Sequence, residues 1–178
     1  MKKKILAFIL LCLMVVSAFS ACAFLNGEKK IENLEDKLQE VDGDIHFEKN
    51  GDAYVAKTDG IRKVTYTAKV GDDEVIDEIV IVFENISSLG RNKMQTALER
   101  TADQMTMEDI RLANLALITA EMYEFCGATE KETMEDVLNT CNFYYYEDEV
   151  IDLTYWKLTG SFDENAKTVT LTAVYEGE

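Results

Sequence analysis

The chain lacks proline and contains only one histidine among its 178 residues. A lone histidine cannot build a metal site that needs two imidazole ligands. Basic residues are also scarce: 18 Lys and Arg stand against 34 Asp and Glu, which gives a formal net charge of −16. A strongly anionic chain is repelled by phosphate backbones. We therefore expect no nucleic-acid partner.

Familiar catalytic motifs are missing as well. The sequence contains no G-x-S-x-G, S-x-x-K, P-loop or G-x-G-x-x-G motif. Its many acid clusters do not match the calcium-loop pattern, although weak calcium binding stays open. The only histidine, His46, is expected to be an exposed or edge-strand polar residue. The sequence thus predicts no catalytic, cofactor or metal site, and favours a protein that is not an enzyme.

What the chain does contain is enough apolar side chain for a core. Hydrophobic residues make up 47% of the sequence and aromatic residues 10%, which argues against a disordered acidic tail. The length suits one domain or two small ones, and it is too short for a barrel enzyme of about 250 residues.

The N-terminus carries an export signal. A basic end at 2–4 is followed by an apolar run, Ile5–Val16, and then by small residues up to Cys22. This order is typical of a secretory signal peptide. The apolar run is shorter than the roughly 20 residues of a membrane span, so a transmembrane anchor is the weaker alternative. We assign residues 1–21 to a signal peptide.

The end of this signal, Phe19-Ser20-Ala21-Cys22, resembles the lipobox of bacterial lipoproteins, with Phe19 in place of the usual leucine. The resemblance implies that Cys22 receives fatty-acyl chains such as palmitate and becomes the first mature residue. Residues 22–27 would then be a short tether to the extracytoplasmic face of a cell membrane. Removal of residues 1–21 takes away three lysines and no acids, so the mature chain has a net charge of −19.

Residues 28–178 are predicted to form a single α+β domain that begins with a helix at Glu28–Val41. Its apolar residues form one stripe that includes Leu34. Alternating segments separated by turn residues, such as Asn50-Gly51, then predict an antiparallel four-strand meander. The four strands are Asp44–Lys49, Asp52–Thr58, Ile61–Val70 and Glu74–Glu84. Because its apolar end has no polar face, the fourth strand is expected to be central or covered on both sides.

Three helices follow, at 92–105, 106–125 and 130–141. Thr106 and Asp109 have the spacing of a capping box, with Asp in place of Glu. The second helix has few polar residues and is expected to be the most buried one, with Leu115 and Leu117 in the core. Leu34, on the peripheral first helix, is expected to contribute less to stability.

Three strands at 143–146, 150–160 and 167–176 complete a C-terminal antiparallel unit. Helices packed on antiparallel sheet define the α+β class. The sequence leaves open whether the two strand groups join into one sheet. A helix from Glu130 to Cys141 would hold the thiols of Cys126 and Cys141 too far apart for a disulfide.

Aromatic residues are the remaining candidates for a binding surface, namely Tyr144, Tyr146, Tyr155 and Trp156. Aromatic residues are also good strand formers, so packing in the core is the main alternative for them.

We expect a membrane-anchored extracytoplasmic lipoprotein that acts as a non-catalytic binding or interaction module for a protein, peptide or glycan. The alternatives are a carrier with a pocket for a small apolar ligand between sheet and helices, and, less favoured, a hydrolase with an unrecognised carboxylate pair.

Overall fold

The computed structural model describes residues 29–71, 74–128 and 150–177. Within them lie three helices, α2 (Ile31–Gln39), α3 (Arg91–Glu99) and α4 (Met107–Phe125). The strands are β1 (Glu48–Asn50), β2 (Ala53–Thr58), β3 (Val64–Val70), β4 (Ile76–Glu84), β5 (Val150–Asp152), β6 (Trp156–Asp163) and β7 (Thr168–Tyr175). The fold is α+β, as the sequence predicts.

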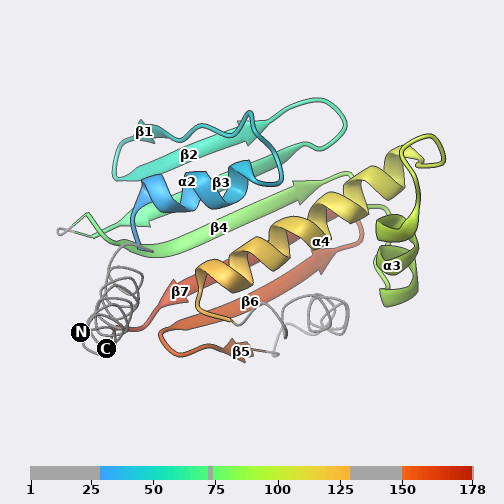
Figure 1. Cartoon of the computed structure of the whole chain (residues 1–178). Coiled ribbons are helices and arrows are strands. Elements are labelled where there is room, and N and C mark those ends of the chain that lie inside the picture. The colour runs from blue at the N-terminus through green and yellow to red at the C-terminus, as the bar shows by residue number, and fades with distance from the viewer. Residues whose placement is uncertain (1–28, 72–73, 129–149, 178) are drawn as a thin grey trace, which may run out of the picture.

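All seven strands belong to one antiparallel sheet in the order β1-β2-β3-β4-β7-β6-β5 (Figure 1). The meander predicted for the first four strands is therefore confirmed. The last strand, β7, pairs with β4 along seven consecutive positions, from Glu78↔Val174 to Glu84↔Thr168. This pairing joins the two strand groups and places β4 in the centre of the sheet.

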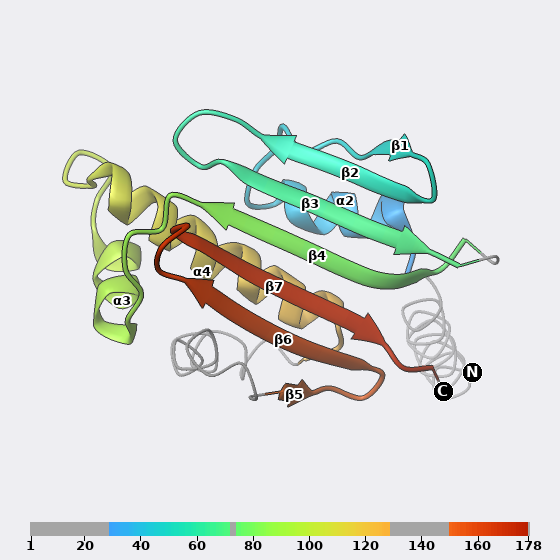
Figure 2. The same cartoon turned by 180° about the vertical axis from the view of Figure 1, so that it is seen from behind.

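One face of the sheet is buried beneath α2 and α4, which lie across it (Figure 1). In β4 the first residue, Ile76, is buried, and from Ile79 onward the buried side chains Ile79, Ile81 and Phe83 alternate with partly exposed neighbours. Successive side chains of a strand point to opposite faces, so this alternation separates a helix-covered face from an open one. Figure 2 shows the open face, with the strands in front and both helices behind them.

Local sequence explains where α4 begins and ends. The Thr106 side chain accepts a hydrogen bond from the Asp109 backbone N–H, and the Asp109 carboxylate accepts one from the Thr106 backbone N–H, so the predicted capping box is confirmed. At the other end, Gly127 takes a φ of +94°. The N–H groups of Gly127 and Ala128 donate to the carbonyl groups of Glu124 and Tyr123, which is the Schellman arrangement.

Helix α4 is the most buried helix of the described chain, with twelve buried residues among its 19. Two details of the core differ from the sequence-based expectation. Leu115 has no exposed surface, but Leu117 is 37% exposed, because two helical steps rotate a side chain by about 200°. Leu34 is fully buried although its helix has a single apolar stripe, since that stripe rests directly on the sheet.

The predicted element ends also need correction. Asn50 pairs with Ala53, so the hairpin turn is made by Gly51 and Asp52, and only Gly51 takes a positive φ, +67°. Helix α3 ends at Glu99 instead of continuing to residue 105. Its C-cap residue, Arg100, takes an extended backbone conformation, with φ −73° and ψ 143°, which ends the helix. The helix predicted at 130–141 and the strand at 143–146 lie outside the described residues.

The buried side chains generate a test of the packing. Leu115→Ala and Leu34→Ala should each lower the free energy of unfolding by about 2–5 kcal/mol, because both leave a cavity. Leu117→Ala is the matched control on the same helix and should cost less than about 1 kcal/mol. Urea unfolding followed by Trp156 fluorescence measures all three, and equal losses for Leu115 and Leu117 would show that this part of the packing is wrong.

Candidate functional site

The open face of the sheet is a field of β-branched and small hydroxyl side chains. Lys57, paired with Thr65, lies at the β2 edge of this face. We define the face by its ten uncharged, partly exposed Val, Thr and Ser residues: Val55, Thr65, Thr67, Val80, Val82, Thr159, Ser161, Thr168, Thr170 and Thr172. Strand register places them in continuous rows, and one row runs from Val55 through Thr67, Val80 and Thr172 to Thr159. All ten are partly exposed, and none is charged or aromatic.

Charged side chains surround this neutral field. Lys69 and Glu78 face each other across β3 and β4 and form an ion pair. In the same row, toward the β5 edge of the sheet, the Lys157 ammonium lies 2.7 Å from the Glu176 carboxylate. At the opposite end of β4, the Lys63 ammonium lies 3.7 Å from the Glu84 carboxylate. A neutral centre with a polar rim is the arrangement found in protein–protein interfaces.

A second candidate site lies at the end of the sheet where the described chain begins. Tyr155 and Tyr175 pack with ring centroids 6.4 Å apart, and the Trp156 ring lies 5.3 Å from Tyr175 and 5.9 Å from Phe125. The Lys29 ammonium donates to the Tyr175 hydroxyl and lies 3.9 Å from the centroid of the same ring. We call Lys29, Tyr155, Trp156 and Tyr175 the tether-end patch.

Of the four aromatic residues singled out in the sequence, the structure brings Tyr155 and Trp156 into this patch. Trp156 is only 4% exposed and Tyr155 is partly exposed, so Trp156 supports the patch from beneath. Tyr144 and Tyr146 lie outside the described residues, as does Cys22. Sequence reasoning missed Lys29, because its proximity to the aromatic residues depends on the sheet order. It also missed Tyr175, although the register of the predicted β6–β7 hairpin, which pairs Tyr175 with Trp156, could have found it.

A small pocket opens beside the patch. It is lined by Lys29, Phe125, Cys126, Gly127, Thr154, Tyr155 and Trp156, and its volume is about 160 Å³. Sites for drug-sized ligands usually measure about 300–1,000 Å³. The pocket therefore gives little support to a carrier of apolar ligands.

A larger cleft of about 370 Å³ lies between α3 and the start of α4. Its carboxylates already have partners: Glu108 accepts hydrogen bonds from Ser87 at 2.6 Å and Ser88 at 3.1 Å, and Asp109 accepts from Thr106 and Arg100. The hydrogen bond from Ser87 is the main cause that lowers the pKa of Glu108, and those from Thr106 lower the pKa of Asp109. A general acid needs a raised pKa, so this cleft is not arranged like a glycosidase pair.

Helices α2 and α4 are joined by a cluster of charged side chains, most of them partly buried. The Lys37 ammonium of α2 lies 3.1 Å from Glu124 and 3.5 Å from Glu121, both on α4, and 3.7 Å from Glu40. Burial is the main cause that raises the pKa of Glu121, and the charge of Lys37 offsets it only in part. Burial also tends to lower the pKa of Lys37, but the hydrogen bond to Glu124 and the nearby carboxylates outweigh it, so the Lys37 pKa is raised.

The remaining candidates are structural. The side chain of His46 is 71% exposed, as expected, and its Nδ1 lies 3.2 Å from a Glu35 carboxylate oxygen that belongs to α2. The same carboxylate accepts a hydrogen bond from the Phe47 backbone N–H at 2.7 Å, so Glu35 fastens the chain that leads into β1. Cys126 is buried at the end of α4, and Cys141 lies outside the described residues.

The described chain contains neither a cluster of metal-binding side chains nor a helix that could span a membrane. In residues 29–71, 74–128 and 150–177, no group of three or more histidine, cysteine or acidic side chains is placed to hold a metal ion. Over the same ranges, no helix combines the length and the apolar character that crossing a bilayer requires.

Comparison with known proteins identifies no relative of this chain. No family model, curated protein or solved structure matches the chain. Fold and surfaces therefore define the class on their own: an α+β domain whose antiparallel sheet is covered by helices on one face and open on the other.

The charge cluster gives a prediction about pH. Because the folded-state pKa of Glu121 is raised, its ionisation opposes folding above that pKa, and this cost disappears as the pH falls through it. Glu121→Gln should therefore stabilise the domain at pH 7 by about 1 kcal/mol or less, and the gain should vanish near pH 4. Urea unfolding at several pH values measures the difference from the unmodified chain.

Glu124→Gln is the matched control for that experiment. It weakens the 3.1 Å charge-assisted bond to Lys37 and should lower stability at pH 7. A Glu121→Gln variant less stable than the unmodified protein at pH 7 would show that attraction to Lys37 outweighs the burial of Glu121.

Proposed function

We propose that the protein is an extracytoplasmic lipoprotein, anchored through Cys22, which acts as a non-catalytic interaction module through the open face of its sheet. The anchor is supported by the order of the first 22 residues, a basic end, an apolar run and Phe19-Ser20-Ala21-Cys22. Acyl chains hold a protein firmly at a bilayer when more than one is attached, since each buried CH₂ contributes about 0.8 kcal/mol.

The observation that carries the interaction role is the neutral open face. It spans five adjacent strands, from β2 to β6, and the row that crosses it from Val55 to Thr159 bears no charge in a mature chain whose net charge is −19. Depletion of charge at the centre and its presence at the rim are features of surfaces that bind other proteins. Seven of the ten residues are Thr or Ser, and a buried hydroxyl needs a hydrogen-bond partner. The proposed partner is therefore a folded protein with a neutral face that combines apolar and hydrogen-bonding groups.

The other partner classes fit this surface less well. Sugar rings are commonly bound by stacking on aromatic side chains, and the ten residues of the open face include none. An extended peptide would add to a sheet edge, but within residues 29–71, 74–128 and 150–177 the two edge strands, β1 and β5, contain three residues each. Short edge strands of this kind discourage strand addition.

The anchor has a direct test. Cys22→Ser should leave an unprocessed precursor that does not incorporate a fatty-acid probe, because the acyl-accepting thiol is gone. Cys12→Ser, which removes a thiol from within the predicted signal peptide, is the matched control and should label normally. Metabolic labelling followed by membrane fractionation measures both, and a labelled, membrane-bound Cys22→Ser protein would remove the basis for the lipoprotein assignment.

The interaction surface can be tested separately by photo-crosslinking in the native cell. A photoreactive amino acid at Val80 or Thr172, two paired positions of the open face, should give the same discrete adduct with one protein partner. The matched control is Asp36, which is exposed on α2 behind the sheet, and it should give no such adduct. Crosslinking that is equal at all three positions, or absent at Val80 and Thr172, contradicts the proposed surface.

A further inference from the structure

The tether-end patch lies close to the proposed lipid. The Lys29 carbonyl accepts a hydrogen bond from the Ile76 N–H at 2.8 Å, which fixes the start of the described chain to the first residue of the central strand. Six residues lie between Cys22 and Lys29, and the seven Cα-to-Cα steps that join them span only about 24 Å even when fully extended. Lys29 therefore stays within that distance of an anchored Cys22.

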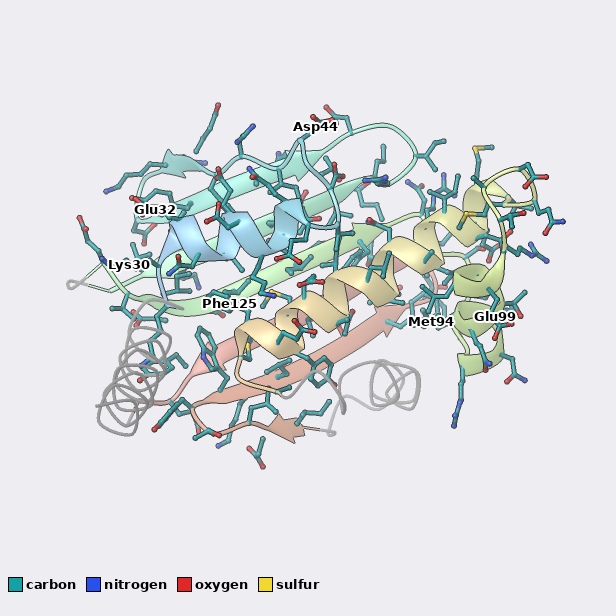
Figure 3. The ribbon with its side chains drawn as sticks, viewed as in Figure 1. Lys30, Glu32, Asp44, Met94, Glu99 and Phe125 are labelled. Atoms are coloured by element: carbon teal, nitrogen blue, oxygen red, sulfur yellow. The ribbon has the colours of Figure 1, made fainter. Side chains whose placement is uncertain are left out.

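Several helices and strands begin or end at the same end of the sheet as Lys29. Figure 3 shows Lys30, before α2, and Phe125, at the last turn of α4, toward one end of the molecule, whereas Met94 and Glu99 of α3 lie at the other end. Pairing of Trp156 with Tyr175 puts the start of β6 and the end of β7 side by side. With the Lys29–Tyr175 contact, these pairings place the whole patch at the tether end.

The chemistry of the patch is that of residues which lie at a membrane surface. Tyrosine and tryptophan are enriched where the bilayer meets water, because each has an apolar ring and a polar group. A lysine near anionic lipids is attracted to their phosphates. Tyr155 and Tyr175 are both partly exposed, and the Lys29 ammonium lies over their rings, 5.5 Å and 3.9 Å from the two centroids.

We propose that the tether-end patch docks against the phospholipid headgroups and sets the orientation of the domain on the membrane. This inference rests on the proposed lipid anchor at Cys22. The strands of the sheet would then run away from the bilayer, because the patch lies at their ends. The open face would point sideways, toward partners held in or on the same membrane.

Acidic side chains limit how strongly this contact can form. Asp52 and Glu74 are exposed in the turns at this end, and Glu176 follows Tyr175. Glu176 is paired with Lys157 at 2.7 Å, but the other two face solvent and are repelled by an anionic bilayer. The patch therefore acts with the lipid and not in place of it, which fits the two-signal pattern of membrane anchoring.

Trp156 is the only tryptophan of the chain and lies within the patch, so it reports on docking. The lipidated protein, with its acyl chains verified by mass spectrometry, is placed in vesicles of phosphatidylglycerol and phosphatidylcholine that carry a headgroup spin label. Trp156 fluorescence should be quenched. Lys29→Gln should reduce the ratio of docked to undocked protein about fivefold, as expected for one lysine near an anionic surface, and Lys29→Arg should preserve it.

Lys57→Gln is the matched control, because Lys57 is an exposed lysine on β2 away from the patch, and it should leave the quenching unchanged. A parallel sample, in which a histidine tag replaces Cys22 and binds nickel-chelating lipids, separates the two proposals. If the native protein carries no lipid, the proposed function fails while the tagged protein still tests docking. Absent quenching in the tagged protein, or equal losses for Lys29→Gln and Lys57→Gln, would falsify the docking proposal.

Discussion

The pairing of β4 with β7 is the constraint on which the rest of the structure depends. It joins a meander built early in the chain to a hairpin built at its end, and it turns two small units into one sheet of seven strands. Isolated hairpins are marginally stable in water. The joined sheet instead presents a continuous apolar face that includes Ile81 and Leu171, wide enough for two helices to pack side by side.

Helix α4 is the counterpart of this face. Most of its surface is buried, which is expected of a helix that is apolar on nearly all sides. Its capping box and its Schellman end stop it at defined residues, so a long apolar segment is held at one length over the sheet. Lys37 of α2 forms ion pairs with Glu124 and Glu121 of α4, so the two helices form one layer over the sheet.

The sequence was sufficient for what depends on local chemistry. Alternation in β3 and β7, the cap at Thr106 and the stop at Gly127 can all be predicted from neighbouring residues. What it could not supply was whatever depends on strand order. The exposure of Leu117 could have been predicted, because at 100° per residue Leu117 falls between Glu121 and Glu124 in the polar sector of α4. Lys29, by contrast, gains its aromatic neighbours only because β6 and β7 end beside β4. The open face has the same origin, since its rows combine residues from five strands.

The position of the last strand also has a consequence for synthesis. The chain emerges N-terminus first, so β1 to β4 are available well before β7. Until β7 arrives, β4 has an unpaired edge and the apolar side chains Ile79, Ile81 and Phe83 lack their neighbours on that side. An exposed edge of this kind is a template for pairing with other chains. Strand β7 therefore completes the centre of the sheet, and the domain cannot reach its native state until β7 has been synthesised.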